Sequence, residues 1–106
     1  MFAKMTETKI NEAIQLEIDL AVKTYGAEYH SQHEGYAILL EEIEEAERDL
    51  DYIRNHLAMI WDVVKVDNEN EVKSNARIIG LDAIELAKEA CQIAAVCKKI
   101  LGEVAQ

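Results

Sequence analysis

An apolar residue recurs every three or four positions along two long stretches of the chain, and this spacing constrains the fold more than any other feature. The first series runs from Tyr36 to Val64 and the second from Val72 to Ile100. Residues spaced in this way share one face of an α-helix. The chain has no proline and only 4 glycines, so few residues oppose helix formation. The sequence therefore predicts an all-α fold.

Capping signals divide the chain into three expected helices. For the first helix, Thr6 or Thr8 is a candidate N-cap and Gly26 is a helix-ending signal. For the second and third helices, Ser31 with Glu34 and Asn68 with Glu71 have the spacing of a capping box. We expect helices from Thr6 or Thr8 to Tyr25, from Gln32 to about Val66, and from Asn68 to Gly102. Gly80 falls inside the third helix, which suggests close packing or a slight kink there.

The length and the apolar surface predict how these helices assemble. A chain of 106 residues forms one domain, so we expect a single helical domain over residues 1–106. Three long helices cannot cover all of their apolar residues, and Leu16 and Leu20 widen the apolar face of the first helix further. We therefore predict an antiparallel bundle of three to five helices completed by homo-oligomerisation, as a dimer or a tetramer.

The charge restricts the partners. The formal net charge is −10, from 21 acidic and 11 basic residues, so a polyanion such as DNA or an anionic membrane is repelled. We expect no binding to nucleic acid or to membranes. The N-terminus lacks an apolar run long enough for a signal peptide, and we expect a cytoplasmic protein. Cys91 and Cys97 are six positions apart on one helix, so they cannot bridge to each other.

Carboxylates border the apolar faces of two helices. Most acidic residues between Glu41 and Asp51 must be solvated, but Glu42 and Glu45 lie next to the apolar series. Glu85 and Glu89 take the same position on the third helix. Two helices that each offer carboxylates can hold a hard divalent cation, Mg²⁺ or Mn²⁺ in preference to Zn²⁺. A di-iron site needs Glu-x-x-His pairs, which the chain lacks.

The segment from His33 to Ala46, followed by that from Leu86 to Val96, resembles the MazG-like group of all-α nucleoside triphosphate pyrophosphohydrolases. The small versions found in phages and prophages are the most similar. That superfamily has Glu-Glu-x-x-Glu on one helix and Glu-x-x-Asp on a later one. Glu41, Glu42 and Glu45 match the first motif.

The second motif departs from the pattern. The chain has Glu89-x-x-Gln92 where the superfamily has a glutamate and an aspartate three positions apart. Asp82-x-x-Glu85 has the charges in the reverse order. A site that lacks one carboxylate either binds its ion weakly, uses fewer ions than its relatives, or has lost catalysis.

The resemblance implies that the chain cleaves a nucleoside triphosphate, or its deoxy form, to the monophosphate and pyrophosphate. It implies Mg²⁺ held by Glu42, Glu45 and Glu89, with Mn²⁺ as an alternative ion, and Glu41 or Glu85 as the acceptor of the water's proton. The residues expected to contact the substrate are Lys88, His33 and Tyr36, with Lys73 or Arg77 as further cations.

Two other functions stay open. With the imperfect second motif, the same fold can serve as a non-catalytic helical oligomerisation or interaction protein. A weaker alternative is an acidic mimic that occupies a basic nucleic-acid-binding partner, which requires carboxylates spread over one exposed face. Trp61 lies beside the apolar series and is expected in the core or at an interface, not stacked on a base.

Overall fold

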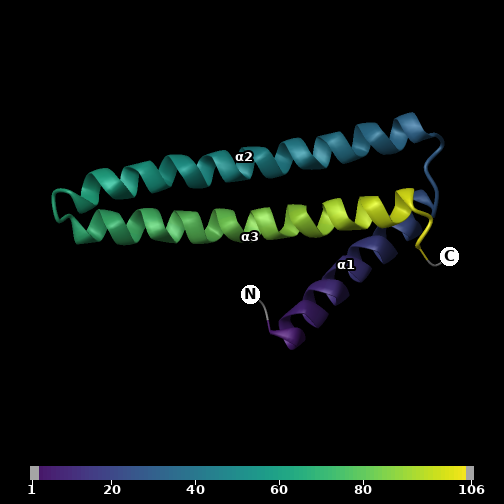
Figure 1. The fold of residues 1–106 in the computed structure, drawn as a ribbon, viewed down its shortest axis with the longest axis horizontal. Coiled ribbons are helices and arrows are strands. Elements are labelled where there is room, and N and C mark those ends of the chain that lie inside the picture. Colours follow the sequence, from purple (N-terminus) through teal and green to yellow (C-terminus); the bar gives the residue numbers. More distant parts are fainter. Residues whose placement is uncertain (1–2, 105–106) are drawn as a thin grey trace. The chain divides into compact units, whose positions relative to one another are not determined.

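The computed structural model describes residues 3–104, which form three α-helices and no strand over that range (Figure 1). They are α1 (Lys4–Tyr25), α2 (Gln32–Val64) and α3 (Glu69–Ile100). The predicted all-α class is confirmed. The chain divides into two compact units, one made of the chain up to Ile43 together with the chain from Glu89 onward, the other of Glu44–Lys88.

The first unit contains the hydrophobic core. Ile14 and Ile18 of α1 pack against Ala95 of α3, and all three are buried. The partly buried apolar residues around them come from both helices and the C-terminal segment: Ile10, Val22, Cys91, Ala94 and Val104. The small side chain of Ala95 lets α1 come close to α3. Leu16 and Leu20, which widen the apolar face of α1, are 65% and 61% exposed.

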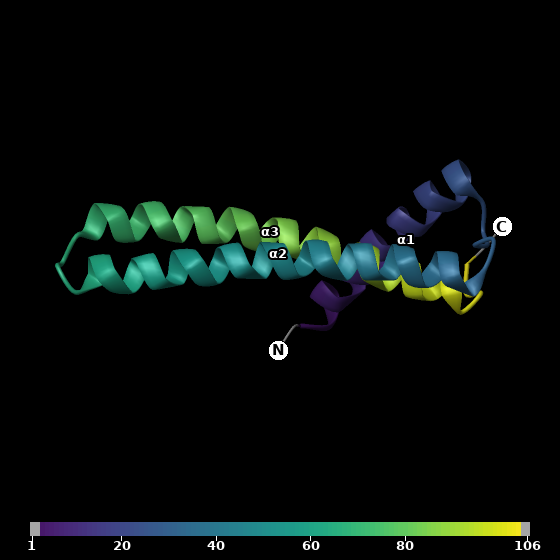
Figure 2. The ribbon, with the colours of Figure 1, turned by 90° about the horizontal axis from the view of Figure 1, so that it is seen from above.

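The second unit is a helical hairpin with almost no core. Its parts of α2 and α3 run antiparallel and lie side by side in both views (Figures 1 and 2). Asn75 is the one buried residue within Glu44–Lys88, and its Nδ2 donates to the Glu71 carbonyl oxygen at 2.9 Å. Two helices cover only one side of each other, so the remaining apolar residues stay partly exposed.

The α2 series shows which apolar residues the hairpin covers. Ala46, Ile53 and Ile60 are half-buried. Leu50 and Leu57, which alternate with them along the helix, are 39% and 59% exposed. The predicted apolar series is therefore wider than the contact that one partner helix provides.

At the starts of α2 and α3, the predicted N-cap residues Ser31 and Asn68 each accept a backbone hydrogen bond. The backbone N–H of Glu34 donates to Ser31 Oγ at 3.1 Å, and the N–H of Glu71 donates to Asn68 Oδ1 at 3.2 Å. Glu34 Oε1 in turn accepts a hydrogen bond from the N–H of His30 at 3.1 Å. These bonds satisfy donors that the first turn of a helix leaves free.

The predicted start of the first helix is wrong. The helix α1 begins at Lys4, after Ala3, which provides no side-chain cap. Thr8 does not cap the helix; its hydroxyl donates to the carbonyl oxygen of Lys4 at 3.1 Å inside the first turns. A threonine hydroxyl can hydrogen-bond to the backbone both at a helix cap and inside a helix, so threonine alone does not fix the first residue of a helix. The residues before Thr6 are able to continue the helix.

The end of α2 also differs from the prediction. The helix stops at Val64, two residues before Val66, because Asp67 adopts a left-handed conformation with φ 54°. The N–H of Asp67 then donates to the Val64 carbonyl at 3.0 Å, and that of Asn68 to the Val63 carbonyl at 2.9 Å. This is a Schellman motif, which satisfies the last carbonyls of the helix.

Close packing occurs at Gly35 and not at Gly80. No neighbouring atom lies within 4 Å of the position that a Cβ would take at Gly80, so close packing there, one of the two expectations, is wrong; the slight kink stays a prediction. At Gly35, a Cβ would lie 3.3 Å from Ile100 Cγ1 and 3.3 Å from Tyr29 Cδ2. The missing side chain at Gly35 lets the start of α2 approach the end of α3 inside the first unit.

Alanine at these two glycines should therefore have opposite effects. Gly80→Ala should stabilise the fold by up to about 1 kcal/mol, because alanine favours the helix and meets open space. Gly35→Ala should destabilise it by roughly 1–3 kcal/mol through overpacking. Urea unfolding followed by circular dichroism measures both values. A Gly80→Ala variant with a lower midpoint than the wild type would contradict the open environment of this glycine.

Candidate metal centre

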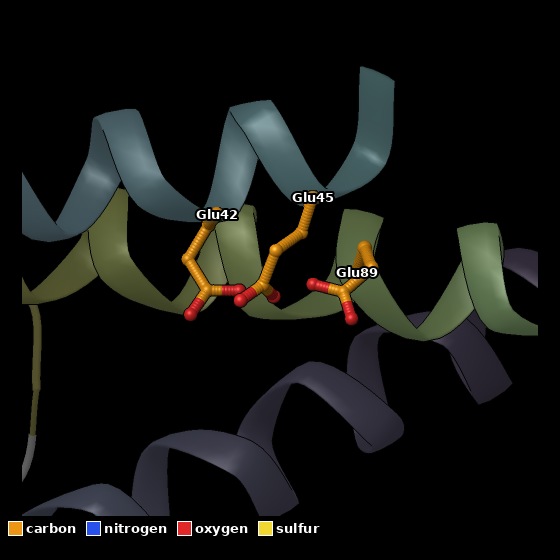
Figure 3. A group of neighbouring side chains, drawn as sticks. All are labelled: Glu42, Glu45 and Glu89. Carbon is orange, nitrogen blue, oxygen red and sulfur yellow. The ribbon is translucent and has the colours of Figure 1, made fainter. Parts of the chain in front are cut away.

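Three carboxylates converge in the structure: Glu42 and Glu45 of α2 and Glu89 of α3. One oxygen from each lies within 4.8 Å of the others, and all three side chains are half-buried (Figure 3). Glu42 and Glu45 share a face of α2 because they are three positions apart on one uninterrupted helix. Glu89 belongs to the same compact unit as Glu42. The structure thus brings together the three residues that the sequence analysis assigned as ligands; their binding of an ion stays a prediction.

Gln92 completes this arrangement. With its amide nitrogen turned toward the carboxylates, Gln92 donates to Glu42 Oε2 at 2.9 Å and to Glu89 Oε2 at 3.1 Å. Gln92 lies three positions after Glu89 on α3, one turn along the same face. The sequence analysis treated this residue only as a departure from the aspartate of the motif. In that orientation of its amide, Gln92 links the carboxylates of α2 and α3.

The donor set fits a hard cation. Carboxylates this close repel one another, and partial burial weakens the screening of that repulsion by water. Oxygen ligands on two helices suit Mg²⁺ or Mn²⁺, and the site offers neither the histidine nor the cysteine that zinc prefers. Glu42, Glu45 and Glu89 are the residues that would hold such an ion.

The other predicted site residues lie outside this cluster. Glu41 is exposed on α2, and so are His33 and Tyr36 near its start. In the second unit, Lys88 Nζ donates to Glu85 Oε1 at 3.0 Å, and both side chains are more than half exposed. An exposed ion pair of this kind contributes little to stability. The structure does not bring these five residues into the carboxylate cluster.

A cavity of about 550 Å³ lies in the first unit, and Glu42 and Gln92 form part of its wall. The rest of the wall comes from α1, the segment between α1 and α2, and the last turns of α3. Aromatic and apolar side chains such as Tyr25, Ile38 and Val96 line it. A cavity of this size can hold a small organic molecule. It places a binding space directly beside the carboxylates.

Tyr29 and Lys99 are cavity residues that the sequence analysis missed. Lys99 is only 9% exposed, and its Nζ lies 4.2 Å from the centre of the Tyr29 ring. Burial raises the pKa of the Tyr29 hydroxyl, and the charges of Glu34, Glu42 and Cys97 raise it further. Tyr29 therefore stays protonated at neutral pH and can donate a hydrogen bond. No spacing rule marks either residue, because one lies in a connecting segment and the other at a helix end.

Residues 3–104 contain no helix that is long and apolar enough to cross a membrane. The chain matches no protein-family model, no curated protein and no solved structure. The carboxylate cluster and the cavity beside it therefore carry the functional argument.

Proposed function

We propose that the chain is a Mg²⁺-dependent nucleoside triphosphate pyrophosphohydrolase. The observation that carries this proposal is the convergence of Glu42, Glu45 and Glu89, with Glu42 on the wall of a cavity large enough for a nucleotide. The resemblance of the Glu41–Glu45 segment to the MazG-like motif supplies the reaction, cleavage between the α- and β-phosphates. A bound Mg²⁺ would supply positive charge for the phosphates and orient the attacking water.

The three clustered carboxylates are placed to act as ligands, and the roles of the residues outside the cluster come from the resemblance. Glu42, Glu45 and Glu89 hold the ion, and Gln92 orients Glu42 and Glu89 through its two hydrogen bonds. Glu41 or Glu85 accepts the proton of the attacking water, a role that requires access to solvent, and both are exposed. Lys88, His33 and Tyr36 are also reachable from solvent, as contacts with the substrate require.

One observation favours the non-catalytic alternative. Gln92 donates hydrogen bonds to both Glu42 and Glu89, so a neutral amide offsets part of their repulsion without an ion. In that case the cluster links α2 to α3 as a polar contact, and the protein acts through its helical surfaces. The two functions predict different responses to Mg²⁺.

Wild-type protein should release pyrophosphate from at least one nucleoside triphosphate or deoxynucleoside triphosphate when Mg²⁺ or Mn²⁺ is present. Glu42→Gln and Glu45→Gln should each lower the rate roughly 100-fold or more, since even groups that only hydrogen-bond to metal ligands contribute 10- to 100-fold. Glu44→Gln is the matched control, because Glu44 lies exposed on the same helix and outside the cluster. A broad nucleotide panel without turnover with either ion would exclude catalysis.

Gln92→Asp tests whether the cluster binds an ion. The substitution adds a carboxylate and removes the amide that donates to Glu42 and Glu89. Without metal, repulsion should lower the melting temperature below that of the wild type. With Mg²⁺, the melting temperature should rise more in the variant than in the wild type, because binding to the native state stabilises it by mass action. If Mg²⁺ shifts neither protein, the non-catalytic function is favoured.

We also propose that the chain self-associates through the second unit. Apolar side chains on both helices of this hairpin are exposed, including Leu57 (59%), Trp61 (61%), Leu81 (61%) and Ile84 (59%). Exposed apolar groups in this number are typical of surfaces that bind another protein. A second copy would supply the helices that complete a bundle.

Light scattering should therefore give a mass of at least twice 12.0 kDa at micromolar concentration. The double variant Leu57→Lys/Trp61→Lys should dissociate, because lysine cannot be buried at an apolar contact without a large desolvation cost. Asn55→Lys is the control, since it adds a positive charge at an exposed polar position of the same helix. A monomeric wild-type protein would contradict the proposed assembly.

A further inference from the structure

Lys99 is an unusual residue in the cavity of the first unit. It is 9% exposed, and it is the one lysine or arginine among the residues that line this cavity. The other charged side chains on the wall are carboxylates: Glu17, Glu28, Glu34 and Glu42. Within residues 3–104, Lys99 Nζ lies over the Tyr29 ring, 4.2 Å from its centre.

Lys99 lines the cavity, so an anion that enters this space can approach its ammonium group. The Tyr29 ring holds Lys99 Nζ at the cavity wall through a cation–π contact, which contributes about 0.5–2 kcal/mol.

Tyr29 lines the same cavity as Lys99 and the four glutamates. The ring lies beside Lys99 Nζ, and the charge of Glu42 contributes to the raised pKa of the Tyr29 hydroxyl. Lys99 and Glu42 line the same cavity, one as a cation and the other as part of a cation-binding group.

We infer that Lys99 and Tyr29 form a phosphate-binding subsite in this cavity. Lys99 Nζ contacts a phosphate oxygen as a point charge, and the Tyr29 hydroxyl donates a hydrogen bond to the same anionic group. The inference rests on the proposed function, because it places the phosphates of that substrate. Of the two candidate lysines, Lys88 is exposed and paired with Glu85, whereas Lys99 is buried and lines the same cavity as Glu42.

Inorganic tripolyphosphate tests this subsite without any need for turnover. Titration calorimetry in the presence of Mg²⁺ should show binding to the wild type, and Lys99→Met should weaken it at least about 10-fold, as loss of a buried charge contact typically costs that much or more. Lys99→Arg keeps the charge and should retain binding within a few-fold. Lys98→Met is the matched control, because Lys98 precedes Lys99 on α3 and lies outside the cavity lining. Unchanged affinity in Lys99→Met would overturn the inference.

A second measurement uses only the wild type, in case Lys99→Met does not fold. Acylation of lysines by an amine-reactive ester, followed by mass spectrometry, should be slowed at Lys99 by tripolyphosphate and unaffected at Lys98. Absence of protection at Lys99 would overturn the inference, as would equal protection by citrate, which carries carboxylates instead of phosphates. Tripolyphosphate binding through Lys99 without hydrolysis of any nucleotide would overturn the proposed function alone. Hydrolysis with an unchanged KM in Lys99→Met would overturn the subsite alone.

Discussion

The repulsion among the carboxylates of Glu42, Glu45 and Glu89 is the constraint on which the functional argument depends. Their oxygens lie within 4.8 Å of one another while the side chains are half-buried. Like charges at this distance lower stability unless a cation or hydrogen-bond donors offset them. Gln92 provides two donors, but an amide carries no net charge. Under the proposed function, a bound cation would offset the remaining negative charge, and its substrate would occupy the cavity beside the cluster.

The surface of the helices carries both exposed apolar residues and exposed acidic residues. The chain carries a net charge of −10, and a surface of one sign of charge repels molecules of the same sign. Trp61 and Leu81 are exposed apolar residues. If another apolar surface covered them, their burial would contribute about 25 cal/mol per Å² to the free energy of association. A hairpin whose one buried residue is Asn75 gains little stability from its own packing. The proposed self-association would bury part of this exposed apolar surface.

Much of the local structure follows from sequence rules because it depends on residues close in the chain. The caps at Ser31 and Asn68 were predictable, since each bond spans three residues. The start of α1 was not predictable from the capping rules, because Thr6 and Thr8 were candidate caps although the helix continues back to Lys4. The convergence of Glu42 and Glu45 with Glu89 was expected from their position beside the apolar series. Gly80 was misjudged because a glycine gives no sign of what lies opposite it.

The sequence by itself determined that the chain is helical, approximately where the helices begin and end, and which carboxylates border their apolar faces. These properties depend on the 3.6-residue period and on short-range hydrogen bonds. Only the tertiary structure decided that Gln92 bridges Glu42 and Glu89, and that Lys99 is buried against Tyr29. Those contacts join segments far apart in the chain, and they depend on how closely α1 and the start of α2 approach the end of α3. No spacing along the sequence encodes that distance.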